Sequence, residues 1–175
     1  MLGSLTTSPA AERPDLLAPP VLAAVSAVAG AQVVEIDPAL ADTAALCAAY
    51  GLELSVSANC VVVTGRRAGQ ERHAACVVLA STRADVNGVV RRHLDVRKVS
   101  FADADFAVSA TGMEYGGITP IGLPSSWTLL IDSAVATTER VVVGSGLRRS
   151  KLVVAGGALA HLPNAEVVDG LARPR

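Results

Sequence analysis

Two unbroken runs of apolar, mostly β-branched residues lie close together in the first half of the chain. They are "CVVVTG" at 60–65 and "AACVVLAS" at 74–81, and the polar stretch "RRAGQERH" at 66–73 separates them. Continuous apolar runs of this length are typical of strands with both faces covered. Because the connector contains a glycine, the pattern predicts a buried β-hairpin.

A third run of the same kind is "RVVVG" at 140–144. We expect all three runs to be central strands of a sheet rather than exposed edges. Residues from each run are therefore predicted to be almost fully buried: Val62, Val78, Leu79 and Val142. Shorter β-rich segments predict further strands, namely "QVVEI" at 32–36, "RKVSF" at 97–101, "WTLLID" at 127–132 and "KLVVAGG" at 151–157, and "VVDGL" at 167–171 predicts a short C-terminal element.

Apolar periodicity and capping residues predict short helices at 20–29, 43–50, 83–94 and 103–112. Asp42 or Thr43 is expected to cap the second of these helices, and Asp103 the fourth. Together the pattern predicts an α/β fold around a mixed, strongly curved or barrel-like sheet of six to seven strands, surrounded by short helices. Residues 1–19 are small, polar and proline-rich, so we expect a flexible N-terminal arm before a single domain at 20–175.

Composition and charge exclude some classes of function. The net charge of −1 argues against a broad polyanion-binding surface, and so against a protein that reads DNA, although contact with only the end of a nucleic acid stays possible. Cys47, Cys60 and Cys76 are scattered, and no cysteine or histidine spacing suggests a zinc site. No secretory signal is visible, and the apolar stretch at 19–34 is too short and interrupted to span a bilayer. We expect a cytoplasmic protein without a metal or cofactor, and a homodimer stays open.

The stretch "GGITPIGLP" at 116–124 is the most distinctive motif, because it has three glycines, two prolines and no charge. It follows a predicted helix rather than opening one, which excludes a Rossmann or P-loop turn. Glycines allow close approach of a ligand to the backbone, and prolines hold the loop in one shape. Such a loop suits a nucleobase with its ribose. The alternative is a tight connection that only packs on the sheet.

Three segments in this order, "ATGMEYGGITPIGLP", "LLID" and "RVVVGSGLRRSKLVV", resemble the YbaK / prolyl-tRNA synthetase-associated editing domain family. Members of that family hydrolyse mischarged aminoacyl-tRNAs. The resemblance runs from about residue 33 to 169 and includes the family's GxxxP motif. It implies that the loop seats the terminal adenosine of tRNA, through Gly116, Gly117, Ile118, Thr119 and Pro120. It also implies that no protein nucleophile and no metal is needed.

The chain departs from the family at two positions. The family's lysine in the first core strand falls here on Asn59 or, with a one-residue shift, on Cys60. At the position after the last GxG where the family often has an acidic residue, this chain has Lys151. One hypothesis is an inactive relative that binds the tRNA acceptor end or a nucleotide without cleaving it. The other is that the cation has moved to the facing strand, because an ammonium can reach a pocket from either wall.

We expect hydrolysis in trans of an aminoacyl-tRNA carrying a small amino acid, with Asn59 and Lys151 lining the aminoacyl pocket. Other interpretations of these residues stay open. Asn59 could be a turn residue before a strand, and Lys151 a solvated strand-end residue beside Arg148 and Arg149. Cys60 could be a nucleophile, although a buried, inert thiol is more common.

Overall fold

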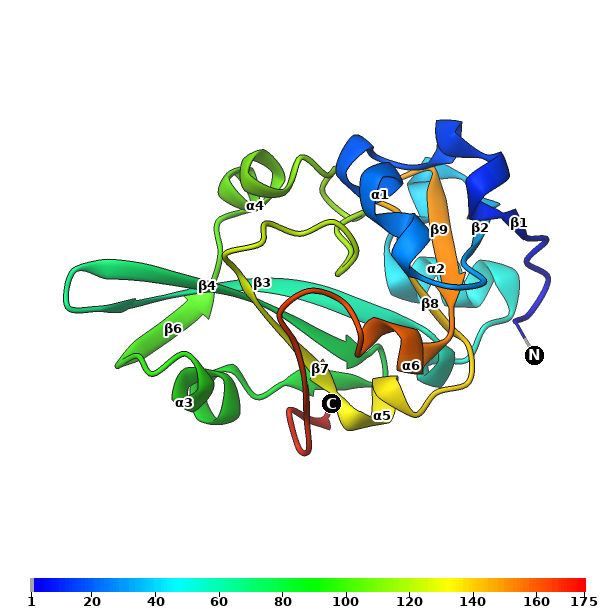
Figure 1. The fold of residues 1–175 in the computed structure, drawn as a ribbon. Helices are drawn as coiled ribbons and strands as arrows, with labels where there is room; N and C mark the ends of the chain where they lie inside the picture. The colour runs from blue at the N-terminus through cyan, green and yellow to red at the C-terminus, as the bar shows by residue number, and fades with distance from the viewer. Residues whose placement is uncertain (1) are drawn as a thin grey trace.

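The computed structural model describes residues 2–175, and their strands form separate sheets rather than a barrel. One sheet has four strands in the order β1-β2-β9-β8, a second has five in the order β10-β7-β4-β3-β6, and β11 pairs with β5 alone. The predicted α/β class with mixed sheets and short helices is confirmed, but the barrel-like closure of six to seven strands is wrong. Figure 1 shows the two larger sheets, with the β3–β4 hairpin projecting at one end.

The strand bounds are β1 Ser8–Pro9, β2 Gln32–Glu35, β3 Ala58–Arg67, β4 Gln70–Leu79, β5 Thr82–Ala84, β6 Lys98–Phe101, β7 Thr128–Asp132, β8 Val141–Gly144, β9 Ser150–Val154, β10 Ala165–Val168 and β11 Ala172–Pro174. The α-helices are α1 Pro19–Ala24, α2 Thr43–Tyr50, α3 Arg91–His93, α4 Ala104–Thr111, α5 Ser133–Ala136 and α6 Gly156–Leu159. A π-helical turn, Val86–Val90, leads into α3, and short 3₁₀ turns occur at Ala10–Glu12, Pro14–Leu16, Val25–Ala27, Pro38–Leu40 and Leu54–Val56.

The two larger sheets do not join into a barrel, because β3 pairs on its free side with β6 over its outer half alone, from Val63↔Phe101 to Arg66↔Lys98. Just before β3, within the described residues, an isolated parallel bridge, Ser57↔Val142, is the backbone pairing that joins the two sheets. This leaves an opening beside the first residues of β3. Apolar periodicity carries no information on how a strand divides its partners, so the sequence could not predict this arrangement.

The predicted hairpin is confirmed, but its connector is much shorter than expected. The strands continue through most of the polar stretch, and only Ala68 and Gly69 turn the chain. Both residues have positive φ, 49° and 80°, as a two-residue type I′ turn requires. The four residues predicted to be buried are between 2% and 9% exposed. β8 is nevertheless the last strand of its sheet, so its predicted central place is wrong.

Helix capping follows the sequence closely. Asp42 accepts hydrogen bonds from the first turn of α2, and Asp103 does the same for α4. Gly51 and Gly112 end these helices in the left-handed conformation, with φ of 66° and 67°. The predicted helix at 20–29 is shorter, since α1 ends at Ala24 and a 3₁₀ turn follows.

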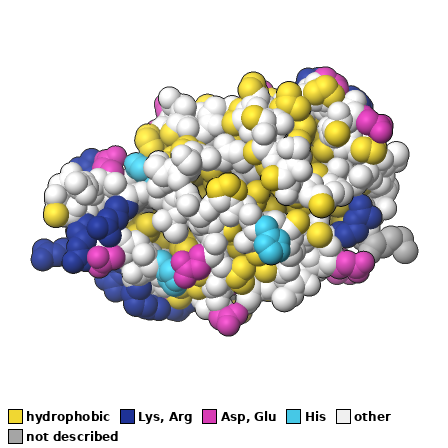
Figure 2. Space-filling view, in the orientation of Figure 1, with side chains coloured by type: hydrophobic (Ala, Val, Ile, Leu, Met, Phe, Trp, Pro, Cys, Tyr) yellow, Lys and Arg dark blue, Asp and Glu magenta, His cyan; other side chains and the backbone are white. Residues whose placement is uncertain are grey.

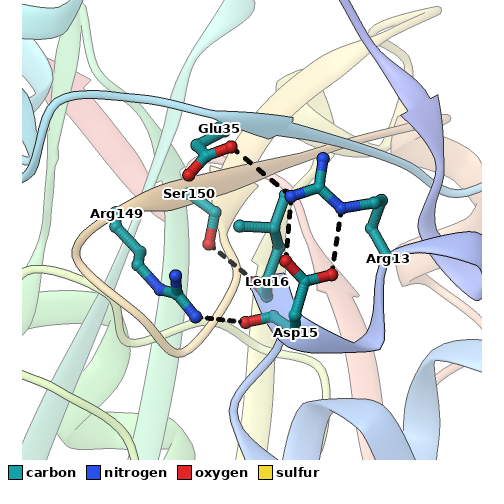
Figure 3. A network of polar contacts seen from close by, with 6 residues as sticks. All are labelled: Arg13, Asp15, Leu16, Glu35, Arg149 and Ser150. Carbon is teal, nitrogen blue, oxygen red and sulfur yellow. Dashed lines mark hydrogen bonds and ion pairs between the residues drawn. The ribbon is translucent and has the colours of Figure 1, made fainter.

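Residues 8–17 pack on the four-stranded sheet, whereas the sequence indicated a flexible arm at 1–19. β1 pairs with β2, and Leu16 and Leu17 are buried in the main core. Ser150 Oγ donates to the Leu16 carbonyl at 2.7 Å, and Arg149 donates to the Asp15 carbonyl at 2.5 Å (Figure 3). Burial of the two leucine side chains stabilises this packing through the hydrophobic effect. The two hydrogen bonds satisfy the backbone carbonyls of Asp15 and Leu16.

The main apolar core lies between the two larger sheets and includes Leu129, Ile131, Val143, Leu152 and Val154. Alternate residues of β9 face opposite ways, as in any strand. Leu152 and Val154 join this core, whereas Val153 packs with Leu46 and Cys47 of α2. Lys151 is two residues before Val153, so its side chain lies on the α2 side of the sheet.

Candidate active site

A cavity of about 680 Å³ lies at the opening between the two sheets. The start of α2, the first residues of β3, the glycine loop and the facing ends of β8 and β9 surround it. The lining includes Thr43, Asn59, Cys60, Phe101, Tyr115, Gly116, Ile118, Arg148 and Lys151. Segments that are far apart in the sequence therefore meet at one site.

Lys151 enters this cavity from β9. Its side chain is almost fully buried, at 5% exposure for the residue. The Nζ atom donates to the carbonyl of Ala41 at 2.9 Å and to the carbonyl of Gly116 at 3.2 Å. The ammonium therefore bridges the segment before α2 and the glycine loop. The predicted inward position of Lys151 is confirmed, and its chemical role stays a prediction.

The surroundings of Lys151 lower the pKa of its side chain. Burial and, after it, the positive charge of Arg148 lower the pKa of Lys151 from 10.5 to about 8, although Asp42 and Cys47 act in the opposite direction. At neutral pH the side chain is therefore still mostly an ammonium ion. An ammonium has three N–H donors. Two of them bind the carbonyls of Ala41 and Gly116. Within the described part of the chain the third donor has no partner, so it can bind a ligand in the cavity.

Asn59 lines the same cavity from β3 and is half-buried. Its Oδ1 atom accepts a hydrogen bond from Thr43 Oγ1 at 2.7 Å. This bond uses the amide oxygen and leaves the amide N–H groups as donors. Asn59 therefore supplies neutral donors at the position where the family resemblance places a lysine.

The structure divides the residues of the glycine loop into two groups. Gly116 and Ile118 line the cavity. Gly117, Thr119 and Pro120 are buried, and none of the three is among the lining residues. Asn59 and Lys151 are thus brought together with only part of the predicted adenosine-binding loop.

Close backbone packing explains why the loop needs its glycines. The carbonyl of Gly117 accepts a hydrogen bond from the Gly146 N–H at 2.8 Å. A Cβ atom on Gly117 would lie 2.8 Å from the backbone of Leu147, and one on Gly144 would lie 2.3 Å from the Gly117 carbonyl. Gly116 has a φ of +82°, which other residues rarely adopt. The loop therefore rests directly on the turn between β8 and β9.

Arg148 fixes the outer side of the loop. Its guanidinium donates to the carbonyls of Tyr115 at 3.0 Å and Pro38 at 3.1 Å, and its backbone N–H donates to the Glu114 carboxylate at 2.6 Å. Arg148 therefore holds the cavity wall together, whereas the neighbouring Arg149 is exposed and binds the N-terminal segment.

Sequence reasoning missed Phe101 and Tyr115, which both line the cavity and are each 66% exposed. The chain has only two Phe, two Tyr and one Trp. An exposed ring is therefore unusual in this protein, and such rings are the kind of surface on which nucleobases stack. The scarcity of aromatics, with Tyr115 next to the glycine loop, was the signal available in the sequence.

The remaining candidates do not point to a nucleophile. Cys60 lines the cavity, but burial and, after it, the nearby Cys76 raise the pKa of its thiol, so the reactive thiolate is disfavoured. Asp132 accepts hydrogen bonds from the N–H groups of Ala134 and Ala172, so it caps α5 rather than serving the cavity. Among residues 2–175, no group of three or more His, Cys, Asp or Glu could hold a metal ion.

None of the helices described here is both long and apolar enough to cross a membrane. Solved structures share the fold at low sequence identity. A candidate trans-editing enzyme for prolyl tRNA synthetase is 21% identical with a TM-score of 0.73, covering 87% of this chain and 94% of its own. A scaffold protein used for computational epitope grafting is 22% identical with a TM-score of 0.73, covering 87% and 95%.

A hypothetical protein is 22% identical with a TM-score of 0.70, covering 81% of this chain and 90% of its own. At these identities the likeness establishes the fold alone. The aminoacyl-tRNA editing domain model, however, matches residues 37–162, which include the glycine loop, Asn59 and Lys151. The chain therefore belongs to the aminoacyl-tRNA editing domain family, whose YbaK-like branch the sequence motifs indicated.

Proposed function

We propose that this protein hydrolyses, in trans, the ester bond of a tRNA mischarged with a small amino acid. The observation that carries the proposal is the buried ammonium of Lys151, which opens onto the same cavity as Asn59 and the exposed part of the glycine loop. Burying a charged lysine destabilises a fold, so its presence at this site supports a functional role. From β9, Lys151 would supply the positive charge that family members are expected to carry on the first core strand.

The reaction needs a positive group near the ester carbonyl. Water, or a hydroxyl or thiol of the substrate itself, adds to the carbonyl carbon, and negative charge develops on the carbonyl oxygen. The remaining N–H of Lys151 and the amide N–H groups of Asn59 stabilise that charge. The C–O bond to the ribose then breaks, and the ribose oxygen takes a proton. When water is the attacking group, the products are the free amino acid and an uncharged tRNA. When a side-chain hydroxyl or thiol of the amino acid attacks, the tRNA again leaves uncharged, and the amino acid leaves as a lactone or thiolactone.

The terminal adenosine would lie against the part of the loop that is accessible. We assign its contacts to Gly116 and Ile118, with Tyr115 and Phe101 as stacking surfaces at the mouth. Gly117, Thr119 and Pro120 would act by holding this surface in place, since they are buried. This narrows the binding role that the sequence suggested for the whole motif.

Selection would depend on the size of the amino acid. A pocket of fixed shape excludes side chains that are too large, but one extra methylene changes binding only about 10–200-fold. The walls near Lys151 contain Val142, Val143 and Leu46, which leave an apolar surface for a small side chain. One structural neighbour, the candidate trans-editing enzyme for prolyl tRNA synthetase, agrees with an editing role of this kind.

The experiment that tests this function follows ester loss from tRNAs charged with glycine, alanine, serine, cysteine, proline and phenylalanine. We expect deacylation of at least one small aminoacyl ester above the rate without protein, and none of the phenylalanyl ester. An Arg140→Ala variant, altered at an exposed residue outside the cavity, should act as the wild type does. Tight binding of charged tRNA without ester loss from any substrate would instead support the non-catalytic relative.

A further inference from the structure

The charges of the molecule are distributed unevenly. The segments 64–73 and 87–101 contain two of the 16 acidic residues, Glu71 and Asp95. They contain seven of the 15 basic residues: Arg66, Arg67, Arg72, Arg91, Arg92, Arg97 and Lys98. These segments form the β3–β4 hairpin tip, α3 and β6, and Figure 2 shows dark blue side chains gathered at that end. We call this region the basic end.

Part of this charge is neutralised within the basic end. Arg66 pairs with Glu71 at 2.5 Å, while Arg67 and Arg72 both approach Asp95. Glu166 of β10 reaches the region only at His93, 3.2 Å away. The other four cations, Arg91, Arg92, Arg97 and Lys98, are exposed and make no ion pair or side-chain hydrogen bond with the residues described. The excess positive charge therefore faces solvent.

Protection of a sheet edge explains only a small part of this cluster. β6 is the edge strand of its sheet, and lysine on an edge strand prevents pairing with other chains. Arg91 and Arg92, however, lie on α3, and Arg97 precedes the strand. Lys98 also lies directly opposite Arg66 in the ladder, where only the pairing of Arg66 with Glu71 offsets the repulsion of two like charges. Edge protection therefore does not account for the remaining cations.

The basic end is hollowed, and its cavity lies along the same two strands as the candidate active site. A second cavity, of about 970 Å³, is lined by residues that include Arg66, Arg91, Arg97 and Lys98. The active-site cavity uses residues 58–62 of β3 and Phe101 of β6, whereas this one uses residues 64–66 and 98–100 of the same strands. At about 3.3 Å per residue, Arg66 lies roughly 23 Å along β3 from Asn59.

We propose that the basic end binds backbone phosphates in the duplex part of the tRNA whose charged end occupies the active-site cavity. This inference rests on the proposed function. A strand that ends in the cavity continues into a duplex, and a duplex carries closely spaced phosphates along its length. Arginine and lysine contacts to phosphate fix position without reading sequence. The overall charge of −1 hides this surface, because acidic residues elsewhere offset it.

The test measures binding of fluorescently labelled, uncharged tRNA by anisotropy between 50 and 200 mM salt. The test variant is Arg91→Glu/Arg97→Glu, and the charge-matched control is Arg83→Glu/Arg140→Glu, both exposed and outside the basic end. We expect the test variant to lose at least ~10-fold in affinity at low salt and its salt slope to fall by about 2, or one for each contact removed. The control should change affinity less than about threefold.

A second measurement separates this inference from the proposed function. A substrate consisting of an aminoacylated dinucleotide has the ester and adenosine but no duplex, so the test variant should cleave it at the wild-type rate. Equal loss of tRNA affinity in both variants, or slower cleavage of the dinucleotide by the test variant, would overturn the inference. If the wild type cleaves no ester at all, the proposed function fails. The anisotropy measurement then still decides whether the basic end binds the tRNA duplex. An Arg97→Ala variant serves if the double variant does not fold.

Discussion

The buried charge of Lys151 lowers the stability of the folded protein, although the proposed function requires that charge. Its charged form is disfavoured in the folded protein, where its pKa is about 8, relative to 10.5 in an unfolded chain. Because the unfolded state then binds more protons between these values, the free energy of unfolding should rise as pH increases from about 8 to 10.5. Below pH 8 the folded protein carries the full cost of burying the charge.

Lys151→Met should therefore stabilise the protein at pH 7, by about 1–3 kcal/mol, because it keeps the apolar stem and removes the buried charge. The carbonyls of Ala41 and Gly116 lose a donor but border an open cavity, where water can replace it. Urea unfolding at pH 7 and pH 10 measures the effect, and the gain should shrink at pH 10. The matched control is Lys98→Met at an exposed lysine, expected to change stability by less than about 0.5 kcal/mol. A destabilised Lys151→Met variant at pH 7 would mean that the ammonium mainly supports the fold.

At the scale of elements, the site depends on how closely the glycine loop rests on β8. Gly144 is opposite Lys151 in the ladder, and a Cβ atom there would lie 2.3 Å from the Gly117 carbonyl and 2.6 Å from that of Ile118. Gly144→Ala should push the loop away and destabilise the protein by about 1–3 kcal/mol. Thermal unfolding measures this change. Gly157→Ala on α6 is the matched control, since its Cβ atom would meet only the Ala136 carbonyl at 3.6 Å; stability equal in the two variants would contradict the packing argument.

The same packing changes the interpretation of Gly117. The sequence indicated that glycines in this proline-held loop allow close approach of a ligand, which would make Gly117 a ligand contact. In the structure the close neighbour is the backbone of Leu147, so a Gly117→Val substitution would disturb the fold itself. The positive φ belongs to Gly116 instead. A motif identifies a loop that needs glycine, but it does not reveal whether a ligand or another backbone segment lies against it.

Local patterns predicted many of the elements but not the helices α5 and α6, and the expected helix at 83–94 begins with strand β5 and becomes a π-helical turn and α3. Aspartates before α2 and α4 and glycines after them gave correct helix ends, since capping depends on neighbouring residues only. The short strands β1, β5 and β11 were missed, because they have three residues or fewer and form only through distant pairing. The exposed Phe101 and Tyr115 were missed for a similar reason. Whether a ring points into a core or to the mouth of a cavity depends on the tertiary fold.

At the scale of the whole molecule, two sheets that do not close into a barrel produce both proposed contacts with tRNA. The opening between them forms the cavity where Lys151 and Asn59 meet, and β3 and β6 continue from that cavity to the basic end. The proposed roles are therefore divided along one pair of strands. Ester chemistry would occur at one end, and the phosphates of the duplex would be held at the other.

The most direct test of the account is the single-turnover rate of deacylation by wild-type protein and by Lys151→Met, measured from pH 6 to pH 9.5 on the best substrate of the tRNA panel. Loss of the ammonium should slow the reaction by about 10²–10³ at pH 7. Because the group loses its proton as pH rises through about 8, the ratio of wild-type to variant rates should fall toward one above that pH. A variant that keeps the wild-type rate at pH 7, or a ratio that grows above pH 8 as a general base would require, would contradict the proposed role of the Lys151 cation.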